Sequence, residues 1–168
     1  DADGDHLLRH RYEWVSEDHE PRAGRPELQD VPMRKIGLGR LYRELVEQRC
    51  VHVRVRELTG SERRVLEDQG VLSVVTAPVI VDNRLWGFIE FDDCAIERQW
   101  LTTEIEALRS AAGIIGAAIH RQQVERALLL EKHRFQQLYE NTPLAILVAG
   151  ADEKVVEVNS AFEKLFGF

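Results

Sequence analysis

Cysteine is scarce in this sequence, and its scarcity excludes the architectures that depend on it. The 168 residues include two cysteines, Cys50 and Cys94, and neither belongs to a Cys-x-x-Cys or mixed Cys/His spacing. A disulfide framework and a structural zinc site are therefore not predicted. His52 follows Cys50 by two residues, but a thiol and an imidazole without a third ligand favour neither a metal nor a haem. We expect no metal, and we expect both thiols to be ordinary buried or half-buried side chains.

A long apolar run is also missing. The longest stretch, Ala111 to Ile119, is well short of the roughly 20 residues that span a bilayer, and its flanks are charged. The first residues, Asp1-Ala2-Asp3-Gly4-Asp5, are acidic and lack the basic start and apolar segment of a secretory signal. We expect these residues to be cytoplasmic and to make no membrane contact.

Excess positive charge and catalytic motifs are absent as well. The formal net charge is −7 and the isoelectric point is near 5.4, so the field of the protein repels phosphate backbones, and no nucleic-acid partner is expected. The acidic pairs Asp92-Asp93 and Glu104 with Glu106 come without a phosphate loop, a nucleophile elbow or a histidine base. The sequence therefore predicts no catalytic residues, and no enzyme activity for this chain.

The residues that are present alternate strand and helix patterns. Val71 to Val81 and Leu85 to Phe91 are β-branched or aromatic runs joined by Asp82-Asn83-Arg84, which predicts an antiparallel hairpin. Cys50 to Arg56 alternates perfectly and predicts a half-buried strand. The remaining predictions are a strand at Leu7–Val15, a loop at Ser16–Pro32, an amphipathic helix at Leu38–Glu47 and a short helix capped by Ser61 that ends at Gly70.

A long helix should begin at Thr102 or Thr103, because no proline follows until Pro143. In the first half of this helix, an apolar stripe favours packing on the sheet. In the second half, charged residues become more frequent and the apolar stripe is sparser. The first stripe is Ile105, Leu108, Ala112, Ile115 and Ile119, and the second is Val124, Leu128, Phe135 and Leu138.

Each residue of this helix adds about 1.5 Å of rise, so it must extend past any sheet of a domain this size. We expect a homodimer, a parallel pair joined through the helix from about Ile105 to Leu138, with charged residues at the margins of the seam (Glu125, Arg126, Glu131 and Lys132). A solitary solvated helix, or one folded back on its own domain, is the alternative, since the heptads are not sustained.

The hairpin Val74-Val75-Thr76-Ala77-Pro78-Val79-Ile80-Val81-Asp82-Asn83-Arg84-Leu85-Trp86-Gly87-Phe88-Ile89-Glu90-Phe91-Asp92-Asp93-Cys94, with Glu67-Asp68-Gln69-Gly70 before it, closely resembles that of GAF domains in bacterial sensor kinases and cyclic-dinucleotide enzymes. The resemblance covers residues 7 to 122 in element order. It implies an α/β (α+β) fold, a central antiparallel sheet flanked by helices. The helix and first strand that open this fold have no counterpart before Leu7.

The tail resembles the beginning of a PAS domain. It reads Arg134-Phe135-Gln136-Gln137-Leu138-Tyr139-Glu140-Asn141-Thr142-Pro143-Leu144-Ala145-Ile146, then Val158-Asn159-Ser160-Ala161-Phe162 and Leu165-Phe166-Gly167-Phe168. We therefore predict a GAF-like domain at 1–120, a helical linker at 121–133 and the start of a PAS-like domain at 134–168.

GAF domains often hold a small ligand against one face of the sheet. Leu85, Gly87, Ile89 and Phe91 should pack beneath the long helix, which leaves the other face as the candidate site: Thr76, Pro78, Trp86, Phe88, Glu90 and Asp92. In the alternative reading, Thr76 and Glu90 bond to each other and the aromatic residues are plain core. The cofactor is unknown, and neither cysteine lies in a bilin-attachment motif.

The predicted function is that of a non-catalytic sensory or regulatory module in bacterial signal transduction. It would bind a small ligand or mediate dimerisation, and relay the signal through the helix to a PAS and an output domain. The alternative is a fragment of a signalling enzyme, a histidine kinase or a diguanylate cyclase or phosphodiesterase, whose catalytic domain lies outside these residues.

Overall fold

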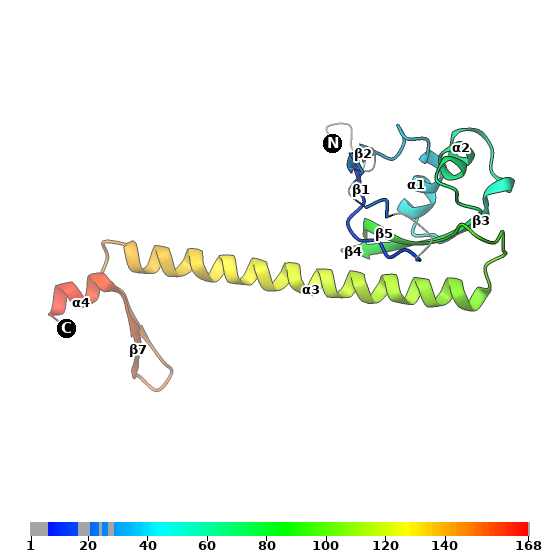
Figure 1. Ribbon diagram of the computed structural model, residues 1–168. Coiled ribbons are helices and arrows are strands. Elements are labelled where there is room, and N and C mark those ends of the chain that lie inside the picture. The colour runs from blue at the N-terminus through cyan, green and yellow to red at the C-terminus, as the bar shows by residue number, and fades with distance from the viewer. Residues whose placement is uncertain (1–6, 17–20, 24, 27–28, 168) are drawn as a thin grey trace. The chain divides into compact units, whose positions relative to one another are not determined.

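A computed structural model describes residues 7–16, 21–23, 25–26 and 29–167 (Figure 1). The chain divides into two compact units, Asp1–Ala118 and Ile119–Phe168. The first contains a three-stranded sheet with helices on both sides, and the second contains a β-hairpin and a short helix. Among the described helices, none combines the length and apolarity that crossing a membrane requires.

The predicted hairpin is confirmed and forms the middle of the sheet. Strand β4 (Ser73–Val81) pairs antiparallel with β3 (Val51–Arg54) on one side and with β5 (Arg84–Asp93) on the other. Asp82 and Asn83 form the turn with φ of 50° and 59°, the double positive φ that a two-residue hairpin needs to match strand twist. The outer edge of β5 has no partner strand within the described residues.

A β-bulge at Trp86 changes which face the start of β5 presents. Val79 is opposite Gly87 but Ile80 is opposite Leu85, so two residues of β5 face one of β4. Leu85 therefore packs with Phe88 against the α1 core. The prediction that Leu85 lies beneath the long helix is wrong, because the strict two-residue alternation it assumed is interrupted at this point.

Helices α1 (Gly39–Val46) and α2 (Gly60–Asp68) cover one face of the sheet. The side chains of α1 pack on β3 and β5, and those of α2 pack with the 3₁₀ turn η2 (Val55–Glu57) around Val74. The buried core of this face consists of Met33, Leu38, Leu41, Tyr42, Leu45, Val51, Val55, Leu58, Leu66, Val71 and Val74. The predicted strand at Cys50–Arg56 thus ends at Arg54, where the chain turns into η2.

The first half of α3 (Thr102–Asn141) covers the other face, so β4 and β5 lie between α1 and α3 (Figure 1). Leu108 and Ala112 are buried, as predicted. A Cβ at Gly116 would lie 2.4 Å from the carbonyl oxygen of Ile80, which makes this the closest approach of helix to sheet. Phe91 was predicted to lie beneath α3 but is 57% exposed, because it stands on the outermost strand while α3 contacts β4.

The N-terminal segment differs most from its prediction. Strand β1 is Leu7–Arg9 rather than Leu7–Val15, and it pairs with β2 (Gln29–Pro32), inside the predicted loop; part of that loop lies outside the described residues. Arg9 donates to both carboxylate oxygens of Asp30 at 2.8 Å, which joins the two strands. Ser61 does not cap α2, whose N-cap is Thr59, because its hydroxyl instead donates to the Gly37 carbonyl at 3.2 Å.

The second unit is organised around Asn159, which is fully buried. Strands β6 (Leu147–Ala149) and β7 (Val155–Val158) form a hairpin, and Asn159 caps α4 (Ser160–Phe166). Its amide nitrogen donates to the carbonyls of Tyr139 and Leu144 at 2.9 Å. Its amide oxygen accepts from the backbone N–H groups of Ile146 and Phe162 at 2.9 and 3.1 Å. One side chain therefore joins the end of α3 to the segment that leads into β6 and to α4.

Candidate ligand-binding face

The sheet register brings most of the predicted site residues together. Thr76 is opposite Glu90 and Pro78 is opposite Phe88, so β4 and β5 place these four on one face, with Asp92 beside Val74. The face is the one covered by α1 and α2. Trp86 is not part of this group: it occupies the bulge and is 48% exposed.

Thr76 and Glu90 bond to each other, as the alternative reading of this face expected. Thr76 is fully buried, and its hydroxyl donates to Glu90 Oε2 at 2.7 Å. Phe88 packs against the α1 core. The polar groups on this face include the carboxyl groups of Glu90 and Asp92, near the end of β5.

Arg22 completes the polar cluster and was not predicted. Its Nη2 donates to Asp92 Oδ2 and its Nη1 to Gln69 Oε1, both at 2.6 Å. Its Nε donates to Glu13 Oε1 at 3.2 Å, and its own backbone N–H and that of Ala23 bond to Glu13 Oε2. Arg22 therefore joins the N-terminal segment, the end of α2 and β5, although it lies in a segment with no sequence period that could have indicated it.

The environment of these carboxyl groups shifts their pKa values in different directions. Burial, and next the charge of Asp92, raise the pKa of Glu90 to about 8 against the opposing effects of Thr76 and Arg22. Burial also raises the pKa of Asp92, although Arg22 opposes that shift. Burial would raise the pKa of Glu13, but backbone hydrogen bonds from Ala23 and Arg22 lower it below its ordinary value. At neutral pH, Glu90 is therefore a neutral acid beside a charged pair.

The cluster retains hydrogen-bonding capacity. Asp92 Oδ1 is buried and has no hydrogen-bond partner among the described residues, so this face can accept one more N–H or O–H donor. No group of three His, Cys, Asp or Glu side chains is arranged for a metal ion in the part of the chain that the structure describes. Cys50 immediately precedes β3, and its sulfur accepts from Arg109 Nε at 3.5 Å. Cys94 packs beside the α2 core.

The family model of the GAF domain matches residues 1–119. This chain belongs to the GAF domain family. A PAS domain model matches residues 133–168, the segment that contains the Asn159 cluster. The hairpin and tail resemblances are thereby both confirmed, and the GAF-like α/β fold with them.

Two curated relatives match over most of this chain. It is 38% identical over 137 residues to the methanogenesis regulatory histidine kinase FilI of Methanothrix harundinacea, covering 81% of this chain. It is 31% identical over 114 residues to an uncharacterised protein of Azorhizobium caulinodans, covering 68%. The match spans 15% of the length of each relative.

Solved GAF domains share the fold. The photoproduct state of GAF3 from Slr1393 of Synechocystis superposes with a TM-score of 0.58 at 22% identity, covering 70% of this chain and 77% of that one. The blue-light absorbing form of the PixJ GAF domain of Thermosynechococcus elongatus gives 0.55 at 18% identity, covering 72% and 71%. A GAF sensory domain related to a histidine kinase regulator supports a role as a signalling sensor.

Proposed function

We propose that this chain is a non-catalytic sensory module that responds at the Thr76–Glu90–Asp92 face and relays the response through α3, which pairs with α3 of a second copy. The observation that carries the proposal is that α3 has two different apolar faces. One face is buried on the sheet, and the other is apolar but exposed along both units.

The two faces follow from the helical repeat of about 3.6 residues per turn. Leu108, Ala112 and Gly116 share the buried face. A second set of apolar residues lies on a different side of α3 and is exposed: Ile114 and Ala117 in the first unit, and Val124, Leu128, Phe135 and Leu138 in the second. We call these six residues the seam. An apolar stripe of this length in water favours a partner helix.

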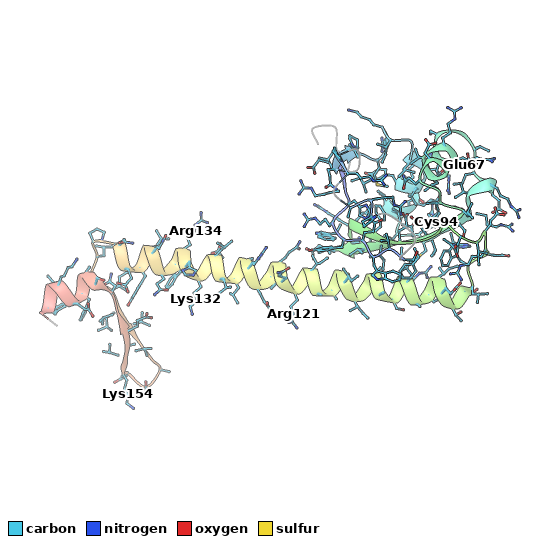
Figure 2. All side chains as sticks on the ribbon, in the orientation of Figure 1. Glu67, Cys94, Arg121, Lys132, Arg134 and Lys154 are labelled. Atoms are coloured by element: carbon cyan, nitrogen blue, oxygen red, sulfur yellow. The ribbon has the colours of Figure 1, made fainter. Side chains whose placement is uncertain are left out.

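A second copy is the partner that the seam fits. Ala117, beside Gly113, permits close approach of a backbone where α3 covers the sheet. Arg134 extends to one side of α3, and Arg121 and Lys132 extend to the other (Figure 2). A parallel pair would bring equivalent residues of both copies together along the seam.

The end of β5 is also connected to the start of α3. Asp93 Oδ1 accepts from the backbone N–H groups of Ala95 and Ile96, and its Oδ2 pairs with Arg98 Nε at 3.3 Å. Arg98 stacks on Trp100 at 4.0 Å and pairs with Glu104 in the first turn of α3 at 3.1 Å. A change at Asp92 would therefore reach α3 through the neighbouring residue Asp93.

Two experiments test the proposal. Light scattering should give a dimer mass at about 100 µM, where even a roughly micromolar dimer is mostly assembled; a monomer mass would exclude the paired helix. Native mass spectrometry of the purified protein would show whether a small molecule is retained, and a ligand retained by wild type but not by Asp92→Asn would place it on this face.

The second candidate is that the chain is part of a signalling enzyme. The histidine kinase relative favours it, since this chain spans 15% of that protein. We infer that the parent is a histidine kinase, with its catalytic domain outside these residues. Robust kinase, cyclase or phosphodiesterase turnover by this chain alone would overturn the non-catalytic assignment.

A further inference from the structure

The polar cluster on the sheet face has more carboxyl groups than cations. Glu13, Glu90 and Asp92 surround one described guanidinium, that of Arg22. Arg22 bonds to Glu13 and Asp92, whose side chains are 7% and 11% exposed. Glu90 bonds to a neutral hydroxyl instead. Two carboxylates already outnumber the single cation, so a third negative charge in this enclosed place is costly.

Among the residues that the structure describes, the other groups near the cluster that the hydrogen bonds and ion pairs identify do not add a second cation beside Glu90. On its own strand Glu90 is followed two residues later by Asp92, on the same face, and Cys94 lies beyond it. Strand β4 contributes Thr76, and the end of α2 contributes the neutral amide of Gln69. From the N-terminal segment, His10 lies 4.0 Å from Glu13 rather than beside Glu90.

We propose that Glu90 is a proton-operated switch: it is neutral in the structure described here, and losing its proton releases the Arg22 contacts that tie the N-terminal segment to β5 and α2. This inference deepens the proposed function by naming the hydrogen-ion concentration as a signal read at the same face. It does not require a small-molecule ligand.

The electrostatics support the switch. The pKa of Glu90 is raised to about 8, chiefly by burial and then by Asp92, so the group would change charge within the range of cellular pH. Above that pH, two carboxylates two residues apart compete for one guanidinium. Arg22 then has to be shared between Glu90 and Asp92, and its bonds to Glu13 and Gln69 weaken as it moves.

The first test follows the carboxyl carbon of Glu90 by ¹³C NMR as pH is raised, with Glu90→Gln used to assign the signal. We expect a midpoint near pH 8. Thr76→Val removes the hydroxyl that donates to the carboxylate and should move the midpoint higher. A midpoint below about 5.5, close to that of a free glutamate, would overturn the switch.

The second test measures hydrogen exchange at the backbone amide of Ala23, which donates to Glu13 Oε2 at 2.6 Å. Protection, corrected for the intrinsic pH dependence of exchange, should fall between about pH 6.5 and about pH 9 in wild type. Glu90→Gln should keep its protection at both pH values. Glu67→Gln on α2, paired with the exposed Arg63 (Figure 2), is the matched control and should behave as wild type.

The outcomes separate the switch from the proposed function. Protection that falls equally in wild type and Glu90→Gln would overturn the switch while leaving the paired helix untouched. A monomer with an intact Glu90 titration would overturn the paired helix while leaving the switch in place.

Discussion

Asn159 shows at the scale of one residue how a side chain can organise a unit. Its amide makes four hydrogen bonds to backbone groups: one of α3, two of the segment before β6 (Leu144 and Ile146) and one of α4. Asn159→Ala would leave two N–H groups and two carbonyls without these partners in a buried place, so we expect a loss of about 2–4 kcal/mol of stability in the second unit. Hydrogen exchange of the β6 and α4 amides measures it.

Asn141→Ala is the matched control for that experiment. Asn141 is exposed and makes one side-chain bond, to the carbonyl of Gln137, so the change should shift stability by less than about 0.5 kcal/mol. Equal effects of the two substitutions would show that the Asn159 bonds do not hold the unit together.

Glu90 should also make stability depend on pH. Its pKa is raised from 4.5 to about 8 on folding, so the folded state holds a proton that the unfolded state releases, and the stabilisation present at low pH is lost as pH rises to about 8. The free energy of unfolding should fall by up to about 1.4 kcal/mol per pH unit across that window. Denaturant unfolding of wild type and Glu90→Gln measures it, and the variant should show a smaller slope; equal slopes would contradict the assignment.

Sequence alone indicates half of this cluster. Alternation along β4 and β5 placed Thr76, Pro78, Phe88, Glu90 and Asp92 on one face, because the strand period is local. Arg22 could not be predicted, since its partners Gln69 and Asp92 are brought to it only by the tertiary fold. Charge pairing between distant segments has no sequence period.

At the scale of elements, α3 meets the sheet at Gly116. Gly116→Ala would place a methyl carbon 2.4 Å from the Ile80 carbonyl oxygen, so helix or strand must shift, and we expect a loss of about 1–3 kcal/mol. Gly113→Ala, where a Cβ meets no atom within 4 Å, should instead stabilise the helix by up to about 1 kcal/mol. Thermal unfolding compares them, and a neutral Gly116→Ala would mean that α3 does not rest on β4.

The elements were predicted where the pattern is local and misjudged where it is not. The hairpin turn, α1 and α3 follow from residues next to one another. The bulge at Trp86 does not, and it moved Leu85 to the α1 side. The pairing of β1 with β2 is also nonlocal, since it brings Arg9 beside Asp30, 21 residues away.

At the scale of the whole molecule, two leucines of α3 test where the seam lies. Leu128 and Leu130 are 69% and 70% exposed on the same helix, but only Leu128 lies on the seam. Leu128→Glu should dissociate the proposed dimer and raise its Kd by at least about tenfold, because a charge would be buried between two helices. Leu130→Glu should leave the Kd unchanged. Sedimentation velocity measures both, and equal effects would contradict the assignment of the seam.

The bare outer edge of β5 has a consequence for solubility. An unpaired edge can form hydrogen bonds with a strand of another chain. The exposed apolar side chain of Phe91 on this strand favours such association further. Exposed charges are the usual protection of such an edge, but the carboxyl groups of Glu90 and Asp92 lie in the polar cluster instead. Preparations of this chain should therefore form β-rich aggregates as the protein concentration rises.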